Sequence, residues 1–283
     1  MTAAIWLLLS CALAAGQPVR SVDPTFLHRY IPDVSPKMAD VTSDSCEYTP
    51  LFGKGDSETT IVRGVARFGQ MTIAPAASCK PVDYPAEEQA YVLMDGDGQL
   101  HYGGDTSPVK RHDFMYLPAG VEHWLANTST SPMHVFVMGF KIAAGTPPPP
   151  KLQIANYDEV RKQNVGGHPD SVVYQLMLGG VKSKRDRIAA GHLLTSLYIM
   201  EFKPGGTNFP HHHEAEEEIY VLLDGTGDIV AGSGTNGLEG RFPSKAGDAY
   251  FFRLNCTVGF YNSNREPAQI LAVRSIFPHT RVR

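Results

Sequence analysis

Short apolar runs separated by turn residues recur along this chain from about residue 60 onward. The interrupting residues are often Gly and Pro, which number 27 and 21 in the whole sequence. This pattern is typical of many short β strands joined by turns. Residues 17–59 are Pro-rich and show few strand signals. We expect them to form an irregular arm that wraps over the first domain.

An internal repeat organises the apolar runs. Two segments of the first half recur in the second half at an offset of 129 residues, and the register resumes after an insertion of six residues in the second copy. The matched segments and residues are 71–77 with 200–206, 88–98 with 217–227, Asp113 with Asp248, and Asn127 with Asn262. One offset that holds through a single gap predicts two copies of one β domain, at residues 60–142 and 172–283.

Residues 143–171 join the two copies. Four consecutive prolines at 147–150 favour a stiff, extended spacer that lacks backbone donors. Further on, Asn156 precedes two acidic residues and could cap a short helix. We therefore interpret this stretch as a linker.

The candidate chemistry is concentrated in residues 205–225, which read Gly-Gly-Thr-Asn-Phe-Pro-His-His-His-Glu-Ala-Glu-Glu-Glu-Ile-Tyr-Val-Leu-Leu-Asp-Gly. Successive side chains of an extended strand point to opposite faces, so His211 and His213 share one face while His212 lies on the other. Together with Glu218 they form a three-ligand set that leaves open positions on a divalent metal ion. Fe or Mn is favoured, and Zn, Ni or Cu are alternatives.

The spacing Gly-x5-His-x-His-x4-Glu-x6-Gly resembles the first signature of the cupin family. All five anchors match: Gly205, His211, His213, Glu218 and Gly225. The resemblance implies an all-β fold of two tandem jelly-roll barrels, a bicupin, preceded by an extended N-terminal arm. The alternative is a surface loop rich in His and Glu that binds nothing.

The second cupin signature, Gly-x5-Pro-x-Gly-x2-His-x3-Asn, is kept differently in the two copies. The first copy departs from it at the opening Gly only, which is His112, and keeps Pro118, Gly120, His123 and Asn127. The second copy keeps Gly247 and Asn262 and replaces the other three positions by Arg253, Asn255 and Val258.

The resemblance also implies four ligand positions in each copy. In the second copy they are His211, His213, Glu218 and Val258, and in the first they are Val82, Tyr84, Gln89 and His123. A lone imidazole and an amide make a poor divalent site, so we expect no metal in the first copy and a packed or hydrogen-bonded His123. The second copy keeps enough ligands for a metal, and its missing ligand leaves a position for water or substrate.

Three more residues are candidates for catalysis or substrate binding. Arg253 could hold a substrate carboxylate through two parallel hydrogen bonds, or form a surface salt bridge. Arg274 lies in an apolar strand, so an inward-pointing charge there would need a partner such as an anionic substrate. Tyr261 could line the cavity or belong to the core. The acidic residues beside the ligand set are expected to form a solvated rim: Glu214, Glu216 and Glu217.

The amino terminus is different in kind. Residues 3–15 are apolar and uncharged but too few to span a bilayer, and small residues near position 16 suit signal-peptidase cleavage. We interpret residues 1–16 as a secretory signal peptide, which implies an extracytoplasmic location, either periplasmic or secreted. A lipid anchor at Cys11 and a buried mature segment are the alternatives.

Cleavage would leave an odd number of cysteines, which cannot form a complete intramolecular disulfide framework. Cys46 and Cys79 could pair in an oxidising compartment, with Cys256 as a buried thiol.

Composition limits the partners. The net charge of −4 shows no basic excess of the kind that nucleic-acid binding needs. Beyond the amino terminus no stretch is long and apolar enough to span a membrane. The expected partner is a small-molecule substrate, and a homo-oligomer stays open.

Two classes of function fit these observations. The first is a metal-dependent enzyme. The two-domain layout resembles cupin dioxygenases such as quercetinases, which implies an oxidoreductase. Hydrolysis, isomerisation or decarboxylation at the same metal is the alternative, because the chain is also similar to ureidoglycine aminohydrolases and oxalate decarboxylases. Neither matches fully, since the ligand order differs from the former and the first barrel lacks the ligands expected of the latter. The second class is a non-catalytic small-molecule-binding cupin.

Overall fold

The computed structural model describes residues 24–58, 60–143, 146, 151–232 and 239–276. The only helices in these ranges are two 3-10 turns, η1 (Ile31–Asp33) and η2 (Tyr157–Glu159), and strands make up the rest of the regular structure. None of the described helices is long or apolar enough to cross a membrane. The predicted all-β fold is therefore confirmed, whereas the predicted signal segment, residues 1–16, lies outside the described residues.

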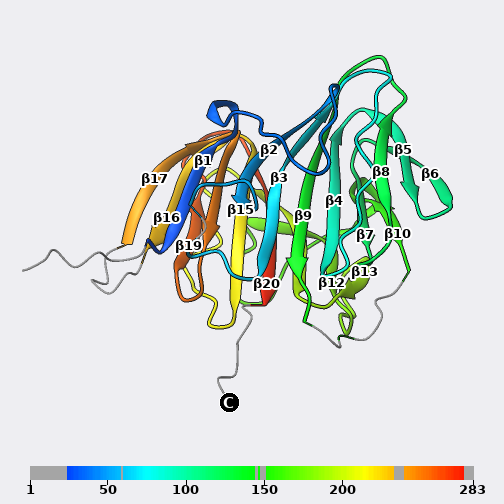
Figure 1. Ribbon diagram of the computed structural model, residues 1–283. Coiled ribbons are helices and arrows are strands. Elements are labelled where there is room, and N and C mark those ends of the chain that lie inside the picture. Colours follow the sequence, from blue (N-terminus) through cyan, green and yellow to red (C-terminus); the bar gives the residue numbers. More distant parts are fainter. Residues whose placement is uncertain (1–23, 59, 144–145, 147–150, 233–238, 277–283) are drawn as a thin grey trace, which may run out of the picture.

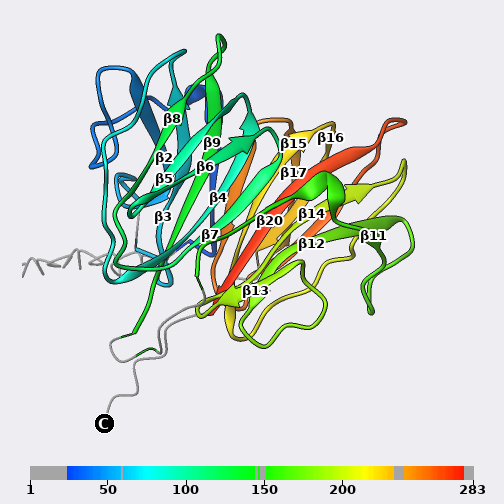
Figure 2. The same cartoon turned by 90° about the vertical axis from the view of Figure 1, so that its right-hand side faces the viewer.

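Two β barrels lie side by side, and each has one large sheet (Figures 1 and 2). In the first barrel the large sheet has the strand order β10 (Gln153–Asn156), β7 (Asp113–Leu117), β4 (Glu87–Asp95), β9 (Met133–Lys141), β3 (Val65–Ile73) and β2 (Cys46–Gly53). In the second barrel the order is β1 (Phe26–Tyr30), β18 (Asp248–Phe252), β15 (Glu216–Asp224), β20 (Ala268–Ile276), β14 (Leu194–Phe202), β12 (Val172–Gly180) and β11 (Lys162–Gln163), with β13 (Ile188–Gly191) paired to β12.

A three-stranded sheet closes the other side of each barrel. In the first barrel it has the order β6 (Asp105–Lys110), β5 (Asp97–Tyr102) and β8 (His123–Asn127). In the second barrel it has the order β17 (Glu239–Lys245), β16 (Thr226–Gly232) and β19 (Thr257–Tyr261). The two barrels thus repeat one topology, as the sequence repeat predicts.

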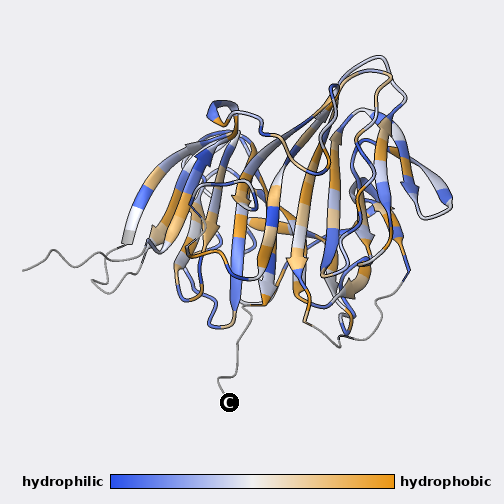
Figure 3. Ribbon diagram, viewed as in Figure 1, coloured by the Kyte–Doolittle hydropathy of each residue, from blue (hydrophilic) through white to orange (hydrophobic). Residues whose placement is uncertain are grey.

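Hydrophobic residues recur along the strands of both barrels (Figure 3). Because successive side chains of a strand point to opposite faces, they form three apolar cores. On β15, Tyr220 and Leu222 pack inside the second barrel, while Ile219 and Val221 pack in the core between the barrels. On β4 the corresponding residues divide in the same way between the first barrel and the shared core. Because the large sheets are buried on both faces, the two barrels share one packed core.

Each barrel receives an edge strand from the segment that precedes the other barrel. Strand β1 pairs antiparallel with β18 of the second barrel. Strand β10 pairs antiparallel with β7 of the first barrel (Figure 1). Our expectation that residues 17–59 wrap over the first domain is therefore wrong for β1, whose Leu27 is buried in the core between the barrels. The linker interpretation of 143–171 is wrong at β10 for the same reason, since an open sheet edge favours pairing with any available strand. The cap predicted at Asn156 is present, because its side chain accepts a hydrogen bond from the Asp158 backbone N–H.

Cys46, at the start of β2, forms a disulfide with Cys79. This bond ties the end of the N-terminal segment to the loop before β4. Cys256 is buried in the second barrel.

Two buried glutamates bind the barrels to each other. The Glu217 carboxylate on β15 accepts hydrogen bonds from the backbone N–H groups of residues 63, 64 and 65 in the first barrel, at 2.7, 2.7 and 3.3 Å. The matching Glu88 on β4 accepts from the N–H groups of residues 192, 193 and 194 in the second barrel, at 2.7 to 3.1 Å. Each glutamate is 1% exposed. The solvated rim expected for Glu217 is therefore wrong, because its side chain faces the other barrel.

Replacing this carboxylate should destabilise the whole protein. In Glu217→Ala three backbone donors lose a charged acceptor in a buried interface, which we expect to cost about 2–4 kcal/mol in the free energy of unfolding. The measurement is urea unfolding, with Glu214→Ala as the control because Glu214 is exposed. Equal midpoints for Glu217→Ala and wild type would contradict the interpretation.

Candidate metal centre

The two predicted histidine ligands lie on an extended segment between β14 and β15. His211 forms an isolated bridge with Val258 on β19, through N–H···O distances of 2.9 and 2.8 Å. The backbone carbonyl of His213 accepts a hydrogen bond from the Asn255 N–H at 3.0 Å. These bonds hold the segment extended, so His211 and His213 point the same way and His212 is exposed.

His211, His213 and Glu218 come together as the spacing predicts. One ligand atom from each lies within 4.8 Å of the others. The Nδ1 of His211 donates to the Phe209 carbonyl at 2.8 Å, which leaves its Nε2 lone pair available. Glu218 accepts a hydrogen bond from the Tyr198 hydroxyl at 2.7 Å through Oε1. His211 and Glu218 are therefore each oriented by a second group.

Two of the facing atoms lack hydrogen-bond partners. The Nε2 of His213 and the Oε2 of Glu218 lie 3.2 Å apart as an ion-pair contact, and within the described structure both atoms are buried without a hydrogen-bond partner. Burial lowers the pKa of His211, which favours the neutral imidazole that binds metals. Burial raises the pKa of Glu218, but His213 and Arg274 outweigh it, so the pKa is lowered and the carboxylate stays ionised. This donor set fits a divalent ion.

The centre opens on a cavity of about 210 Å³ inside the second barrel. Its lining includes Tyr174, Ser196, His211, His213, Tyr220 and Arg274. Arg274 is therefore at the centre, and its Nη1 donates to Glu216 at 3.1 Å. Glu216 is thus partly buried and paired rather than part of a solvated rim, while Glu214 is exposed as expected.

The other two catalytic candidates lie elsewhere. Tyr261 on β19 is stacked under the Arg241 guanidinium, 4.2 Å from the ring centre, and does not line the cavity. Its neighbour Phe260 takes the inward position on the strand. Arg253 follows β18, where its backbone N–H donates to the Thr25 carbonyl, and it does not line the cavity either.

The matching positions of the first barrel hold no such ligand set. His123 is 1% exposed, with its Nδ1 donating to the Val121 carbonyl and its Nε2 accepting from the Tyr91 hydroxyl. Burial lowers the pKa of His123, in line with this neutral, fully hydrogen-bonded imidazole.

A buried charged cluster around Arg67, which we did not predict from the sequence, also lies in the first barrel. Arg67 on β3 is 3% exposed and donates to Asp40, Tyr84 and Glu87. Arg67 lies in an apolar strand, as Arg274 does, and this pattern could have indicated a buried charge that needs a partner.

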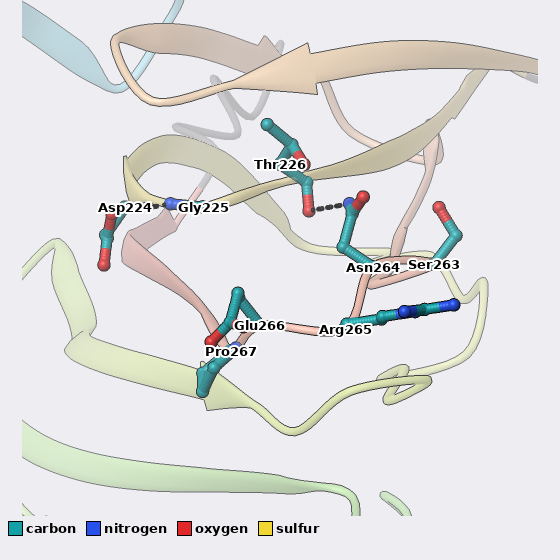
Figure 4. Close-up of a pocket in the computed structure, with 8 residues that line it drawn as sticks. All are labelled: Asp224, Gly225, Thr226, Ser263, Asn264, Arg265, Glu266 and Pro267. Atoms are coloured by element: carbon teal, nitrogen blue, oxygen red, sulfur yellow. Dashed lines mark hydrogen bonds between the residues drawn. The ribbon is translucent and has the colours of Figure 1, made fainter.

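A larger depression of about 890 Å³ lies on the loops of the second barrel (Figure 4). Its lining consists of Asp224, Gly225, Thr226, Ser263, Asn264, Arg265, Glu266 and Pro267. Asp224 is six residues beyond Glu218 on β15, roughly 20 Å along the strand. The Asn264 side chain donates to the Thr226 carbonyl in this open loop surface. The smaller cavity is the candidate site, because two of the three ligand residues, His211 and His213, line it.

A family model described as "Cupin domain" matches residues 69–139 and 198–274, which together are more than half of the chain. The chain belongs to the cupin family. The two matches fall on the two barrels, so this protein is a bicupin. A comparison with curated protein sequences gave no significant match.

Solved structures share the bicupin fold at low sequence identity. A protein designated as glyoxylate-induced, from Pseudomonas aeruginosa, has a TM-score of 0.74 and 14% identity over 95% of this chain and 96% of its own. YlbA from E. coli has a TM-score of 0.69 and 13% identity over 94% and 97%. Oxalate decarboxylase from Bacillus subtilis, described with Mn(II) centres, has a TM-score of 0.66 and 11% identity over 92% and 79%.

Removing a ligand should weaken metal binding without unfolding the barrel. For His211→Ala, His213→Ala and Glu218→Gln we expect the affinity for Mn(II) or Fe(II) to fall at least about tenfold. Metal content after dialysis, measured by elemental analysis, tests this. His212→Ala is the matched control, because its side chain is exposed on the opposite face. Unchanged metal content in the three variants would exclude this ligand set.

The charged cluster of the first barrel should give a pH-dependent stability. Burial raises the pKa of Asp40, but Lys54 and Arg67 outweigh it and lower the pKa from 3.8 to about 2. A carboxylate with a depressed pKa contributes stability above its unfolded pKa and loses it as pH falls through the folded value. The destabilisation of Asp40→Asn should therefore be full above about pH 4 and shrink toward pH 2.

Urea unfolding of the wild type and of Asp40→Asn across this range measures the difference. Asp44→Asn, at an exposed position, is the control. A destabilisation that does not change with pH would contradict the assigned role of Asp40.

Proposed function

We propose that this bicupin is a metal-dependent enzyme that acts on a small organic substrate in its C-terminal barrel. The observation that carries the proposal is the convergence of His211, His213 and Glu218 beside a cavity that the two histidines line, with two buried ligand atoms that lack hydrogen-bond partners in the described structure. Such buried polar atoms are costly unless a ligand satisfies them.

The residues of the second barrel divide the work. His211 and His213 would hold a divalent ion, and Glu218, oriented by Tyr198, would complete the set. When bound, this ion supplies a Lewis acid that polarises a substrate oxygen. Val258 places a buried apolar side chain at the fourth ligand position, so this position offers no fourth protein ligand.

Two histidines and one carboxylate with open positions favour Fe or Mn. The finer form of the proposal is an oxidoreductase of the cupin dioxygenase type. Hydrolase or isomerase chemistry uses the same ion without oxygen, and a small-molecule-binding protein would use the cavity without turnover. The described Mn(II) centres of the Bacillus subtilis oxalate decarboxylase support Mn as a metal to test.

We also propose that the protein works outside the cytoplasm. The uncharged apolar run within residues 1–16 supports this, and so does the Cys46–Cys79 disulfide, because such bonds persist in oxidising compartments.

Anaerobic purification followed by elemental analysis tests the metal. We expect close to one equivalent of Fe or Mn per chain, and less than about a tenth of an equivalent after reconstitution would contradict the proposal. Oxygen uptake against a panel of phenols and enediols then tests the reaction type. Uptake should disappear on chelation and return with Fe(II) or Mn(II). Substrate turnover without oxygen uptake would favour the hydrolase or isomerase alternative, and no turnover would favour a binding protein.

A further inference from the structure

Each barrel has one arginine in the same cross-strand residue pair of its large sheet. The arginine belongs to one strand of the pair in the first barrel and to the other strand in the second. In the first barrel Arg67 on β3 is paired across the strands with Gly139 on β9. In the second barrel the equivalent pair is Ser196 on β14 with Arg274 on β20. Both guanidinium groups donate to the equivalent glutamate, Glu87 or Glu216.

The arginine lies on different strands in the two barrels, and in each case the residue paired with it is small, Gly139 or Ser196. A side chain at Gly139 would meet the Glu87 carboxylate and the Gln89 amide at 2.6 Å, so Arg67 and its partners already fill that space. In the second barrel the small Ser196 leaves the equivalent space to Arg274. The two arginines therefore reach the same region of their barrels.

The two barrels differ in the groups that accept hydrogen bonds from the arginine. The Nη1 of Arg67 donates to both oxygens of Asp40, at 3.0 and 3.1 Å, and to the Tyr84 hydroxyl at 2.8 Å. Asp40 comes from the irregular segment between η1 and β2. The first barrel thus supplies its own carboxylate to its arginine.

The second barrel has no carboxylate at the matching position. Residues 31–33 match 157–159, and β2 matches β12, both at an offset of 126 residues. The same offset places Gly166 where the first copy has Asp40. Gly166 lines the cavity of the metal centre, and no atom would lie within 4 Å of a Cβ added there.

The atoms around this vacant position lack partners. The Nε of Arg274 and the Oγ of Ser196 are buried, and within the described residues neither has a hydrogen-bond partner. Both residues line the cavity. The Tyr174 hydroxyl is similar, but its first-barrel counterpart Tyr48 is also unpartnered, so it does not distinguish the two barrels.

From these observations we propose that the cavity of the second barrel binds the carboxylate of a small organic acid, with Arg274 as the residue that holds it. The ligand carboxylate takes the place that Asp40 fills in the first barrel. The planar guanidinium suits a carboxylate, with which it can form two parallel hydrogen bonds. A cavity of about 210 Å³ is below the usual range of about 300–1,000 Å³ for ligand pockets, which limits the acid to a few carbons.

This inference rests on the proposed function, because the bound metal ion contributes to the net charge around the cavity. Arg185 also lines the cavity, and its charge is balanced by Asp186 at 3.8 Å. Glu216 and Glu218 then carry two negative charges against one positive charge on Arg274. A divalent ion at the ligand set makes the sum positive, so that an anion is attracted. A short hydroxy or oxo acid would place its carboxylate at Arg274 and its other oxygen toward the ligand set.

The test is calorimetric titration of the Mn(II)-loaded protein with glycolate and pyruvate. Acetamide and phosphate serve as a neutral analogue and as a non-planar anion. In the wild type we expect glycolate or pyruvate to bind, acetamide not to bind, and phosphate to bind at least tenfold more weakly. Gly166→Asp supplies a second internal carboxylate and should weaken acid binding at least tenfold. Gly166→Ala is the control that adds a Cβ without charge, and it should bind as the wild type does.

The metal content of each variant separates the two proposals. Failure of the wild type to take up Mn(II) would overturn the proposed function. Normal uptake with no binding of either acid, with equal binding by Gly166→Asp, or with phosphate bound in preference to the acids would overturn the carboxylate inference alone.

Discussion

Adjacent carboxylates on β15 point to opposite faces of one sheet, and the rest of the molecule depends on this alternation. Glu217 faces the first barrel and binds its backbone N–H groups, whereas Glu218 faces the interior of its own barrel and belongs to the ligand set. A strand has a side-chain period of two, so a shift of one residue would exchange these roles. The contact between the barrels and the candidate metal centre are therefore fixed by the same register.

The two barrels show how one backbone can hold either a filled or an open interior. Both keep the bridge between the segment before the long strand and the small sheet, at Val82 with His123 and at His211 with Val258. In the first barrel the ligand positions are apolar, hydrogen-bonded or neutral, and a salt-bridge cluster occupies the mouth. In the second barrel three of the four positions carry donor atoms, and His211 and His213 line a cavity. The asymmetry lies in side chains, because the topology is shared.

The sequence predicts those features of the fold and the candidate site that depend only on residues close together in the chain. The parity of His211 and His213 needs only an extended backbone. The apolar neighbours of Arg274 indicate that its charge would need a partner if it pointed inward, but they do not predict its direction, because both faces of β20 are buried. The pairing of β1 with β18 joins residues more than 200 positions apart, such as Leu27 and Phe251, and a five-residue strand carries too little pattern to predict it. Three successive glutamates look alike in sequence, and only the partner backbone from the other barrel distinguishes Glu217. The Cys46–Cys79 bond depends on the same long-range placement.

The segments that exchange strands also determine what occupies each barrel. In each copy, one edge strand joins the other barrel, the chain returns through an irregular segment, and it then enters its own barrel at β2 or β12. Asp40 and Gly166 lie on these returning segments, over the mouths of their barrels. Apart from the two-residue strand β11, these segments have no sheet register to preserve. A single residue outside a strand, such as Asp40 or Gly166, can therefore fill or leave open the space beside the arginine without disturbing a strand. Strands hold the donor atoms in place, and the connecting segments decide whether a ligand can reach them.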